Sequence, residues 1–206
     1  MVEKQAVYLV DDDDLLLKTL SNVFRFSGFE VQEFRSPFDF LNSSLDLDNA
    51  CVVLDLNMPL MTGLELQERL SEEGIFIPIV VYTGDADVQT AVRAMAGGAF
   101  TLVQKPCANQ LLVETVRKAI NTKRLIEAHH RLESLSGREK QVALLVAEGM
   151  SSTEIAAKLG VGRRTAESHR SNILQKLGLS STASLVELVV LAGLKNDRLL
   201  SLNTRY

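Results

Sequence analysis

Cysteine is scarce in this sequence, and long apolar runs are absent from it. Cys51 and Cys107, the two cysteines among 206 residues, lie far apart and fit no CxxC spacing. A disulfide scaffold is therefore not expected, and free thiols in a reducing compartment are. No run approaches the ~18 apolar residues of a membrane span, and no apolar signal region follows the initial MVEKQ. We expect a cytoplasmic protein with no membrane partner.

Charge is divided unevenly along the chain. Residues 1–120 hold 9 Lys+Arg against 18 Asp+Glu, whereas residues 136–206 hold 10 against 6. The polar segment 121–135 is compatible with a helix or a hinge, and its His129 and His130 have no companions at metal-ligand spacing. An acidic N-terminal part and a basic C-terminal part of the chain indicate two domains with different partners. The sequence therefore predicts a first domain at 1–120, a linker at 121–135 and a second domain at 136–206.

Strand and helix patterns alternate through the first domain. Short apolar, β-branched runs are typical of strands buried on both faces; they occupy residues 6–10, 51–54, 77–82 and 99–103, with a weaker run at 30–34. Helix-start signals lie between them, namely Ser36 before a proline, the Thr62–Glu65 capping box and Asp87. This alternation predicts an α/β domain with a parallel sheet.

Polar side chains follow four of the predicted strands at their carboxyl ends. They are Asp11 and Asp12 after the first strand, Asp55 after 51–54, Thr83 after 77–82 and Lys105 after 99–103. Ligands of an open parallel sheet bind outside these ends, so the side chains should gather at one edge. Asp13 and Asp14 belong instead to the next loop and helix start, where negative charge suits the helix dipole.

Such an oxygen-rich edge suits metal binding and phosphoryl transfer. A hard cation such as Mg²⁺, or Mn²⁺, takes carboxylate ligands and relieves the repulsion among them. Phosphoryl transfer needs neutralisation of charge around the transferred group, and a carboxylate nucleophile would become an acyl phosphate. We expect the metal, Thr83 and Lys105 to hold the phosphoryl oxygens.

The strand pattern ends before Ser136, and the second domain is predicted to be small and helical. Capping boxes Ser136–Glu139 and Ser151–Glu154 begin two of its helices. A helix at 152–159, a turn at 160–162 and a helix to about Leu177 form a helix-turn-helix arrangement. This arrangement favours DNA binding.

The second helix of this pair has an apolar face and a polar face. At 100° per residue, Ala166, Ile173 and Leu177 point inward. The polar face holds our candidates for reading base edges, which are Arg164, Ser168, Ser171 and Gln175, flanked by Glu167 and Asn172. Candidates for phosphate contacts are Arg163, Arg164, His169, Lys176 and Lys158. Thr165 and Arg170 complete the set, although Arg170 points toward the packed side and has Glu139 as an alternative partner.

The last pattern, residues 181–194, is apolar nearly all round. Its core-facing positions are Leu185, Leu188, Val189 and Ala192. Val186, Val190 and Leu194 either contact a symmetric partner or complete a four-helix core, and the sequence leaves both open.

Several motifs carry a family resemblance. VDDD at 10–13, LDLNMP at 54–59, YTGDADVQTAVRAMAGGA at 82–99 and QKP at 104–106 resemble, in this order, the receiver domain of two-component response regulators. SGRE, IAAKLGV and RTAESHRSNILQKL resemble LuxR-type DNA-binding domains, and the whole chain resembles the FixJ/NarL group. The resemblance implies a flavodoxin-like, doubly wound five-stranded sheet followed by a four-helix domain.

The resemblance also implies roles for the site residues. Asp55 is the implied phosphoacceptor, with a sensor histidine kinase as donor. Asp12, Asp55 and the Asn57 backbone carbonyl are implied metal ligands, with Asp11 acting through water. Thr83 and Lys105 would bind the phosphoryl group, and the Lys105–Pro106 bond would be cis. The implied function is a regulator rather than an enzyme, which on phosphorylation dimerises, binds promoter DNA and engages the transcription machinery.

One position departs from the receiver pattern. An aromatic switch residue usually stands three places before the lysine, where this chain has Leu102. Phe100 lies two residues earlier, on the same side of an extended strand, and is our candidate substitute.

Two other functions stay open at this stage. One is a phosphorylation-independent DNA-binding regulator with a vestigial receiver. Leucine at position 102, in place of the usual aromatic residue, is consistent with this alternative. The other is an aspartate-nucleophile phosphohydrolase of the haloacid-dehalogenase type, whose signature Asp11-x-Asp13 resembles in part. That enzyme leaves the helix-turn-helix unexplained.

Overall fold

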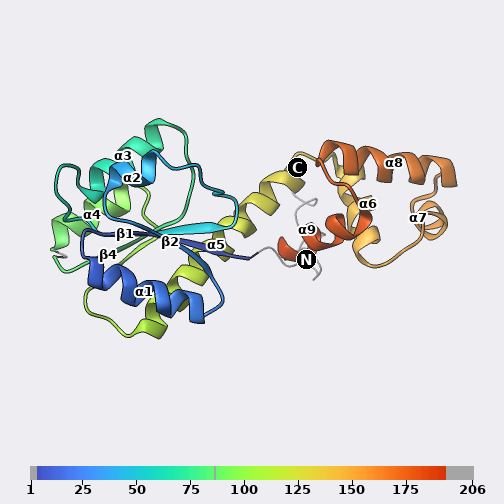
Figure 1. Cartoon of the computed structure of the whole chain (residues 1–206). Helices are drawn as coiled ribbons and strands as arrows, with labels where there is room; N and C mark the ends of the chain where they lie inside the picture. Colours follow the sequence, from blue (N-terminus) through green and yellow to red (C-terminus); the bar gives the residue numbers. More distant parts are fainter. Residues whose placement is uncertain (1–3, 86, 194–206) are drawn as a thin grey trace. The chain divides into compact units, whose positions relative to one another are not determined.

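The first part of the chain forms a parallel sheet between two layers of helices (Figure 1). The computed structural model describes residues 4–85 and 87–193. The strands are β1 (Ala6–Val10), β2 (Glu30–Phe34), β3 (Ala50–Leu54), β4 (Ile79–Thr83) and β5 (Thr101–Gln104), in the spatial order β2-β1-β3-β4-β5. The helices are α1 (Asp14–Phe26), α2 (Pro37–Leu41), α3 (Gly63–Glu72), α4 (Val88–Ala96) and α5 (Asn109–Glu133). The predicted doubly wound, flavodoxin-like fold is confirmed.

Each face of the sheet has its own hydrophobic core. Val7 and Leu9 of β1 face α1 and α5, where Phe24 and Leu112 are buried. The alternate residues Tyr8 and Val10 face α2, α3 and α4, together with Phe40, Leu66 and Ala94. Because both faces are covered, β3 and β4 are buried along their whole length.

Two strands begin later than the sequence pattern predicts. β4 starts at Ile79 rather than at residue 77, because Pro78 has no N–H to donate to the ladder. β5 starts at Thr101 rather than at residue 99, because the N–H of Ala99 is used by the end of α4, where it donates to the Ala94 carbonyl at 3.0 Å.

The predicted caps fix where the helices begin. Ser36, Thr62 and Asp87 each accept a backbone N–H of the following helix through their side chains. Asp13 does the same for α1, with its Oδ1 accepting from Leu15 at 2.9 Å and from Leu16 at 3.1 Å. The carboxylate of Asp13 is therefore directed into the helix start.

The second part of the chain is an all-helical unit with its own core. Its helices are α6 (Gly137–Ala147), α7 (Ser152–Leu159), α8 (Arg163–Lys176) and α9 (Thr182–Leu191). Both predicted capping boxes, at Ser136 and Ser151, are present. α7 ends at Gly160, whose φ of 65° lies in the left-handed region that favours glycine, and the chain then turns into α8.

Helix α5 contributes to both cores. Leu112, Val116 and Ile120 are buried in the first unit, and Ala128 and Leu132 are buried in the second. Contacts along the chain divide it between Lys123 and Arg124. The segment expected as a linker is therefore helical as far as Glu133. Across the described residues, no helix combines the length and the apolar character that crossing a membrane requires.

Candidate functional site

Strand register brings the predicted acidic residues together. In the β1–β3 pair, Val10 lies beside Leu54, so the next residues, Asp11 and Asp55, leave neighbouring strands at the same level. The N–H of Asp55 donates to the Val10 carbonyl at 2.9 Å, which extends the ladder by one bond. β1 and β3 flank the point where the strand order reverses, which is where open α/β sheets bind ligands.

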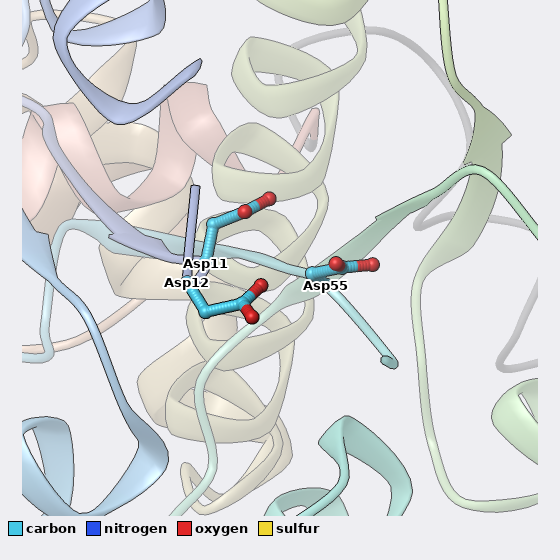
Figure 2. A group of neighbouring side chains, drawn as sticks. All are labelled: Asp11, Asp12 and Asp55. Atoms are coloured by element: carbon cyan, nitrogen blue, oxygen red, sulfur yellow. The ribbon is translucent and has the colours of Figure 1, made fainter. Parts of the chain in front are cut away.

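Three carboxylates converge at this point (Figure 2). Asp11, Asp12 and Asp55 each offer an oxygen, and the three oxygens lie within 4.8 Å of one another. Asp11 and Asp55 are buried, whereas Asp12 is exposed. Like charges at this spacing repel, and burial strengthens the repulsion, so a cation is required beside them.

Lys105 supplies one positive charge. Its Nζ lies 2.6 Å from Asp11 Oδ2 and 3.2 Å from Asp55 Oδ2. The Lys105–Pro106 peptide bond is cis. The Lys105 N–H donates to the Thr83 carbonyl at 2.8 Å, which continues the β4–β5 ladder to the site.

The charges at the site shift each other's protonation. Burial raises the pKa of Asp11, and the ammonium of Lys105 together with the N–H of Asp13 offsets part of that rise. Burial lowers the pKa of Lys105, but Asp11 and Asp55 outweigh it and hold the pKa above its ordinary value. Lys105 is therefore a fixed cation at neutral pH.

Thr83 carries a hydroxyl that is fully buried. Among the described residues, no group forms a hydrogen bond with Thr83 Oγ1. A buried hydroxyl without a partner is destabilising, and such groups concentrate at functional sites. As the last residue of β4, Thr83 lies at the same sheet edge as the carboxylates.

Gly63, which the sequence analysis missed, controls the loop after Asp55. A Cβ at this position would lie 2.2 Å from the Asp55 carbonyl oxygen and 2.9 Å from Leu56 Cα. The Gly63 N–H donates to the Leu56 carbonyl at 3.0 Å, and the Leu56 N–H donates to Asp55 Oδ1 at 2.8 Å. Glycine thus allows the start of α3 to pack directly on the backbone that carries Asp55. The signal was a glycine directly after a helix N-cap.

The rest of this loop lies at the surface. Asn57, predicted as a ligand through its carbonyl, is exposed two residues beyond Asp55. Leu60 is 93% exposed and has a φ of 70°, and the Met61 N–H donates to the Pro59 carbonyl at 2.9 Å across it. A leucine in this conformation is strained, and such residues cluster near functional sites.

The prediction that Phe100 and Leu102 share a side is wrong. Phe100 packs against the core between the sheet and the α1/α5 layer, whereas Leu102 packs against the core on the opposite face. β5 begins at Thr101, so Phe100 lies just before the strand, although its N–H still donates to the Ile79 carbonyl of β4 at 2.8 Å. Phe100 therefore does not lie on the side of the sheet where an aromatic at position 102 would pack.

The two thiols differ in accessibility. Cys51 is fully buried in β3, and burial raises the pKa of its thiol strongly. Cys107, two residues beyond Lys105, is half-buried. Both are free cysteines.

Helix α8 presents the predicted polar face to solvent. Ala166 and Ile173 are buried, as is Leu177 just beyond the helix. The exposed candidates are Arg163, Arg164, Thr165, Glu167, Ser168, Ser171, Asn172, Gln175 and Lys176, and His169 is half-buried.

The alternative pairing of Arg170 with Glu139 is not formed. Arg170 is half-buried and donates to Ser152 Oγ at 3.3 Å and to Thr182 Oγ1 at 3.4 Å. Glu139 instead binds Lys176 at 3.0 Å, and the hydrogen bond from the Ser136 backbone, together with Lys176, lowers the pKa of Glu139 to about 2. Arg170 therefore connects α8 to α7 and α9.

The candidate dimer residues of α9 differ in exposure. Val186 is half-buried and packs against the helical core, whereas Val190 is 46% exposed. Leu194 lies outside the described residues. Leu185, Leu188, Val189 and Ala192 are buried as predicted.

Comparison with known proteins places both units in families. Residues 7–117 match the response regulator receiver domain, and residues 133–192 match the bacterial regulatory proteins of the luxR family. The response regulator protein TmoT of Ectopseudomonas mendocina is 35% identical, over 89% of this chain and 87% of its own. The transcriptional regulatory protein FixJ of Azorhizobium caulinodans is 33% identical, over 94% and 95%.

A solved structure agrees over the same span. Full-length FixJ from B. japonicum is 32% identical, covers 95% of this chain and 100% of its own, and superposes with a TM-score of 0.56. Fold and site together define a receiver linked to a helix-turn-helix domain. The chain belongs to the two-component response regulators, as a transcription factor with a LuxR-type DNA-binding domain.

Proposed function

We propose that Asp55 is the phosphoacceptor of this regulator, and a sensor histidine kinase its donor. The observation that carries this proposal is the position of Asp55, buried at the end of β3 between two further carboxylates and Lys105. A carboxylate oxygen of Asp55 attacks the phosphorus of a phosphohistidine and forms a P–O bond. The P–N bond breaks, and its electron pair stays on the imidazole nitrogen.

The donor set suits a hard divalent cation. We propose that Asp12, Asp55 and the Asn57 carbonyl bind Mg²⁺ or Mn²⁺ directly and that Asp11 binds it through water, because carboxylate and carbonyl oxygens are the ligands such ions prefer. When bound, the ion neutralises charge on the phosphoryl oxygens. Lys105 neutralises a second oxygen, and the Thr83 hydroxyl, which lacks a partner among the described residues, donates to a third.

The chain's own contacts argue against the phosphohydrolase alternative. That alternative needs the carboxylates of Asp11 and Asp13 together at the reacting centre. Asp13 instead uses its carboxylate to cap α1. The helix-turn-helix unit also has no part in that reaction, so we propose that the chain acts as a regulator and not as an enzyme.

Intact-mass measurement with Mg²⁺ and acetyl phosphate tests this proposal. Wild type should gain one phosphoryl group, and Asp55→Asn should gain none. Asp48→Asn, which changes an exposed aspartate in the loop before β3, is the matched control and should behave as wild type. Gain in Asp55→Asn would overturn the assignment. No gain in wild type from acetyl phosphate or from a phosphorylated kinase would favour the vestigial-receiver alternative.

The second unit is proposed to bind promoter DNA through α8. Arg164, Ser168, Ser171 and Gln175, with Glu167 and Asn172, would read base edges, and Thr165 would contact the site beside them. Phosphate contacts would come from Arg163, His169 and Lys158. Lys176 can join them once its bond to Glu139 opens, whereas Arg170 acts in packing. We propose that phosphorylation promotes dimerisation, with Val190 in the interface, and that the dimer engages the transcription machinery.

A further inference from the structure

Helix α4 has one fully buried residue, near its C-terminal end, whereas Thr90 and Ala91 toward its start are half-buried. Of its nine residues, Ala94 alone is buried, and it lies in the last turn. Val88, Val92 and Met95 are 80%, 61% and 48% exposed. Helix α1 of the same unit, by contrast, buries four residues spread along its length. The attachment of α4 to the core is therefore concentrated at its C-terminal end.

Gln67 of α3 adds a second attachment at that same end. Its side chain is 2% exposed, and its Nε2 donates to the Ala94 carbonyl at 3.3 Å. The last four carbonyls of a helix have no partner inside the helix, and that of Ala94 is one of them. The carbonyl also accepts the N–H of Ala99 at 3.0 Å. Gln67 thus caps the end of α4 from the neighbouring helix.

Packing alone does not account for a glutamine at this place. Its neighbour Leu66 and the next core residue of α3, Leu70, are apolar and fully buried. Within the described residues, Gln67 Oε1 is buried and has no hydrogen-bond partner, which is destabilising. A methionine would fill similar volume without that cost. Among the residues that the structure describes, the hydrogen bond to the Ala94 carbonyl of α4 is the one that distinguishes Gln67 from an apolar residue.

The N-terminal end of α4 is attached differently. It begins after Asp87, whose side chain accepts the Thr90 N–H at 2.6 Å, and this bond stays within the helix start. Between the described residues, no hydrogen bond joins this end to another element. In the sequence, three residues separate Thr83 from the Asp87 cap, so this end of α4 is the one nearer to Thr83 along the chain.

Resting on the proposed phosphorylation of Asp55, we infer that Gln67 is the tether that makes the C-terminal end of α4 a pivot. When the Thr83 hydroxyl engages the phosphoryl group, the loop after β4 moves and draws the N-terminal end of α4 with it. Gln67 and Ala94 hold the other end in place. The movement is a tilt of the helix about this point rather than a displacement of the whole helix.

Gln67→Met in the full-length chain, followed by hydrogen exchange and mass spectrometry, tests the tether. The unphosphorylated variant should exchange the amides of Gly97 and Ala99 about fivefold faster than wild type, as expected for loss of one hydrogen bond. The urea midpoint should stay equal or rise, because the unpartnered Oε1 is removed; a purely structural glutamine would lower it. Gln110→Met, which changes an exposed glutamine on α5, is the matched control and should leave α4 unchanged. Unchanged exchange in Gln67→Met would overturn the tether.

The pivot is tested in the same samples after treatment with acetyl phosphate and Mg²⁺. Phosphorylation of wild type should change exchange at Val88–Ala91 and leave Gly97–Ala99 unaltered, and in Gln67→Met it should change both. Equal change at both ends of α4 in wild type would overturn the pivot. If wild type gains no phosphoryl group from acetyl phosphate or from a phosphorylated kinase, the proposed function and the pivot fail together, while the unphosphorylated pair still decides the tether.

Discussion

At the scale of single residues, close contacts decide which side chains the site tolerates. Gly63 lies against the backbone of Asp55 and Leu56, whereas Gly137 occupies the equivalent place after the Ser136 cap with open space around it. The two glycines follow the same helix-capping motif, so their difference isolates the effect of the contact.

We predict that Gly63→Ala lowers the free energy of unfolding by about 1–3 kcal/mol, because the added methyl overpacks the loop that carries Asp55. Phosphorylation from acetyl phosphate should slow in parallel. Gly137→Ala should be neutral or stabilise by up to about 1 kcal/mol. Urea unfolding and the rate of mass gain measure both effects; equal behaviour of the two variants would contradict the argument.

Glu139 gives a prediction about pH. Its pKa of about 2 in the folded chain lies below its ordinary value of 4.5, because Ser136 and Lys176 bind its charged form. A lowered pKa means that this stabilisation is present above pH 4.5 and is lost as the pH falls toward 2. The free energy of unfolding of wild type should therefore exceed that of Glu139→Gln by about 0.5–1 kcal/mol at neutral pH. This difference should decrease as the pH is lowered.

Unfolding of the two chains by urea over that pH range measures this difference. Glu154→Gln alters the second capping box, where Ser151 alone accounts for the lowered pKa, and should show a smaller change. A difference that stays constant with pH would show that the charge of Glu139 is not involved.

At the scale of elements, α8 is proposed to make two kinds of DNA contact, to phosphates and to base edges, and these respond differently to salt. Arg163 stands at its start and binds Glu167 at 2.8 Å, and Gln175 lies on the exposed face near its end. A phosphate contact releases counterions whatever the sequence, whereas a base contact acts only on the preferred site.

We predict that Arg163→Ala weakens specific and non-specific DNA binding alike and reduces the slope of log K against log salt by about 1. Gln175→Ala should weaken only the specific site, by about 1–3 kcal/mol, and leave the slope unchanged. Fluorescence anisotropy on DNA selected from a random pool, at several salt concentrations, separates the two. If Arg163→Ala weakened only the specific site and Gln175→Ala changed the salt dependence, the proposed phosphate and base contacts would be assigned the other way round.

At the scale of the whole molecule, α5 determines where the chain can be divided. Ala128, Leu132 and Leu135 are buried in the core of the second unit, although they precede the domain start at 136 that the sequence predicts. A fragment of residues 136–206 lacks all three. A fragment of residues 124–206 keeps them.

We predict that the shorter fragment is less stable than the longer one by several kcal/mol, because burial of a leucine contributes about 1.5–3 kcal/mol. Thermal unfolding followed by circular dichroism compares the fragments. Leu125→Ala in the longer fragment, at an exposed position of α5, should have little effect. Equal melting temperatures would show that α5 adds nothing to the second core.

Most of the fold and the residues of the site followed from periodic signals. The order of strands and caps, and the gathering of Asp11, Asp12, Asp55 and Lys105, depend on patterns that a parallel sheet imposes. The side on which Phe100 packs could not be read in this way, because the apolar run at 99–103 placed the start of β5 two residues too early. The partners of long side chains could not be predicted from the sequence either. Arg170 is an example, because several acceptors lie within reach of its side chain and it donates to Ser152.

The contrast between the two thiols has a practical consequence. Cys51 is sealed in β3, so a maleimide dye should react at Cys107 alone without any engineered cysteine. The dye would be attached two residues from Lys105, near the proposed phosphorylation site. The native chain therefore carries its own attachment point for a fluorescent reporter of signalling, suited to stopped-flow recording of how fast the site is loaded and emptied.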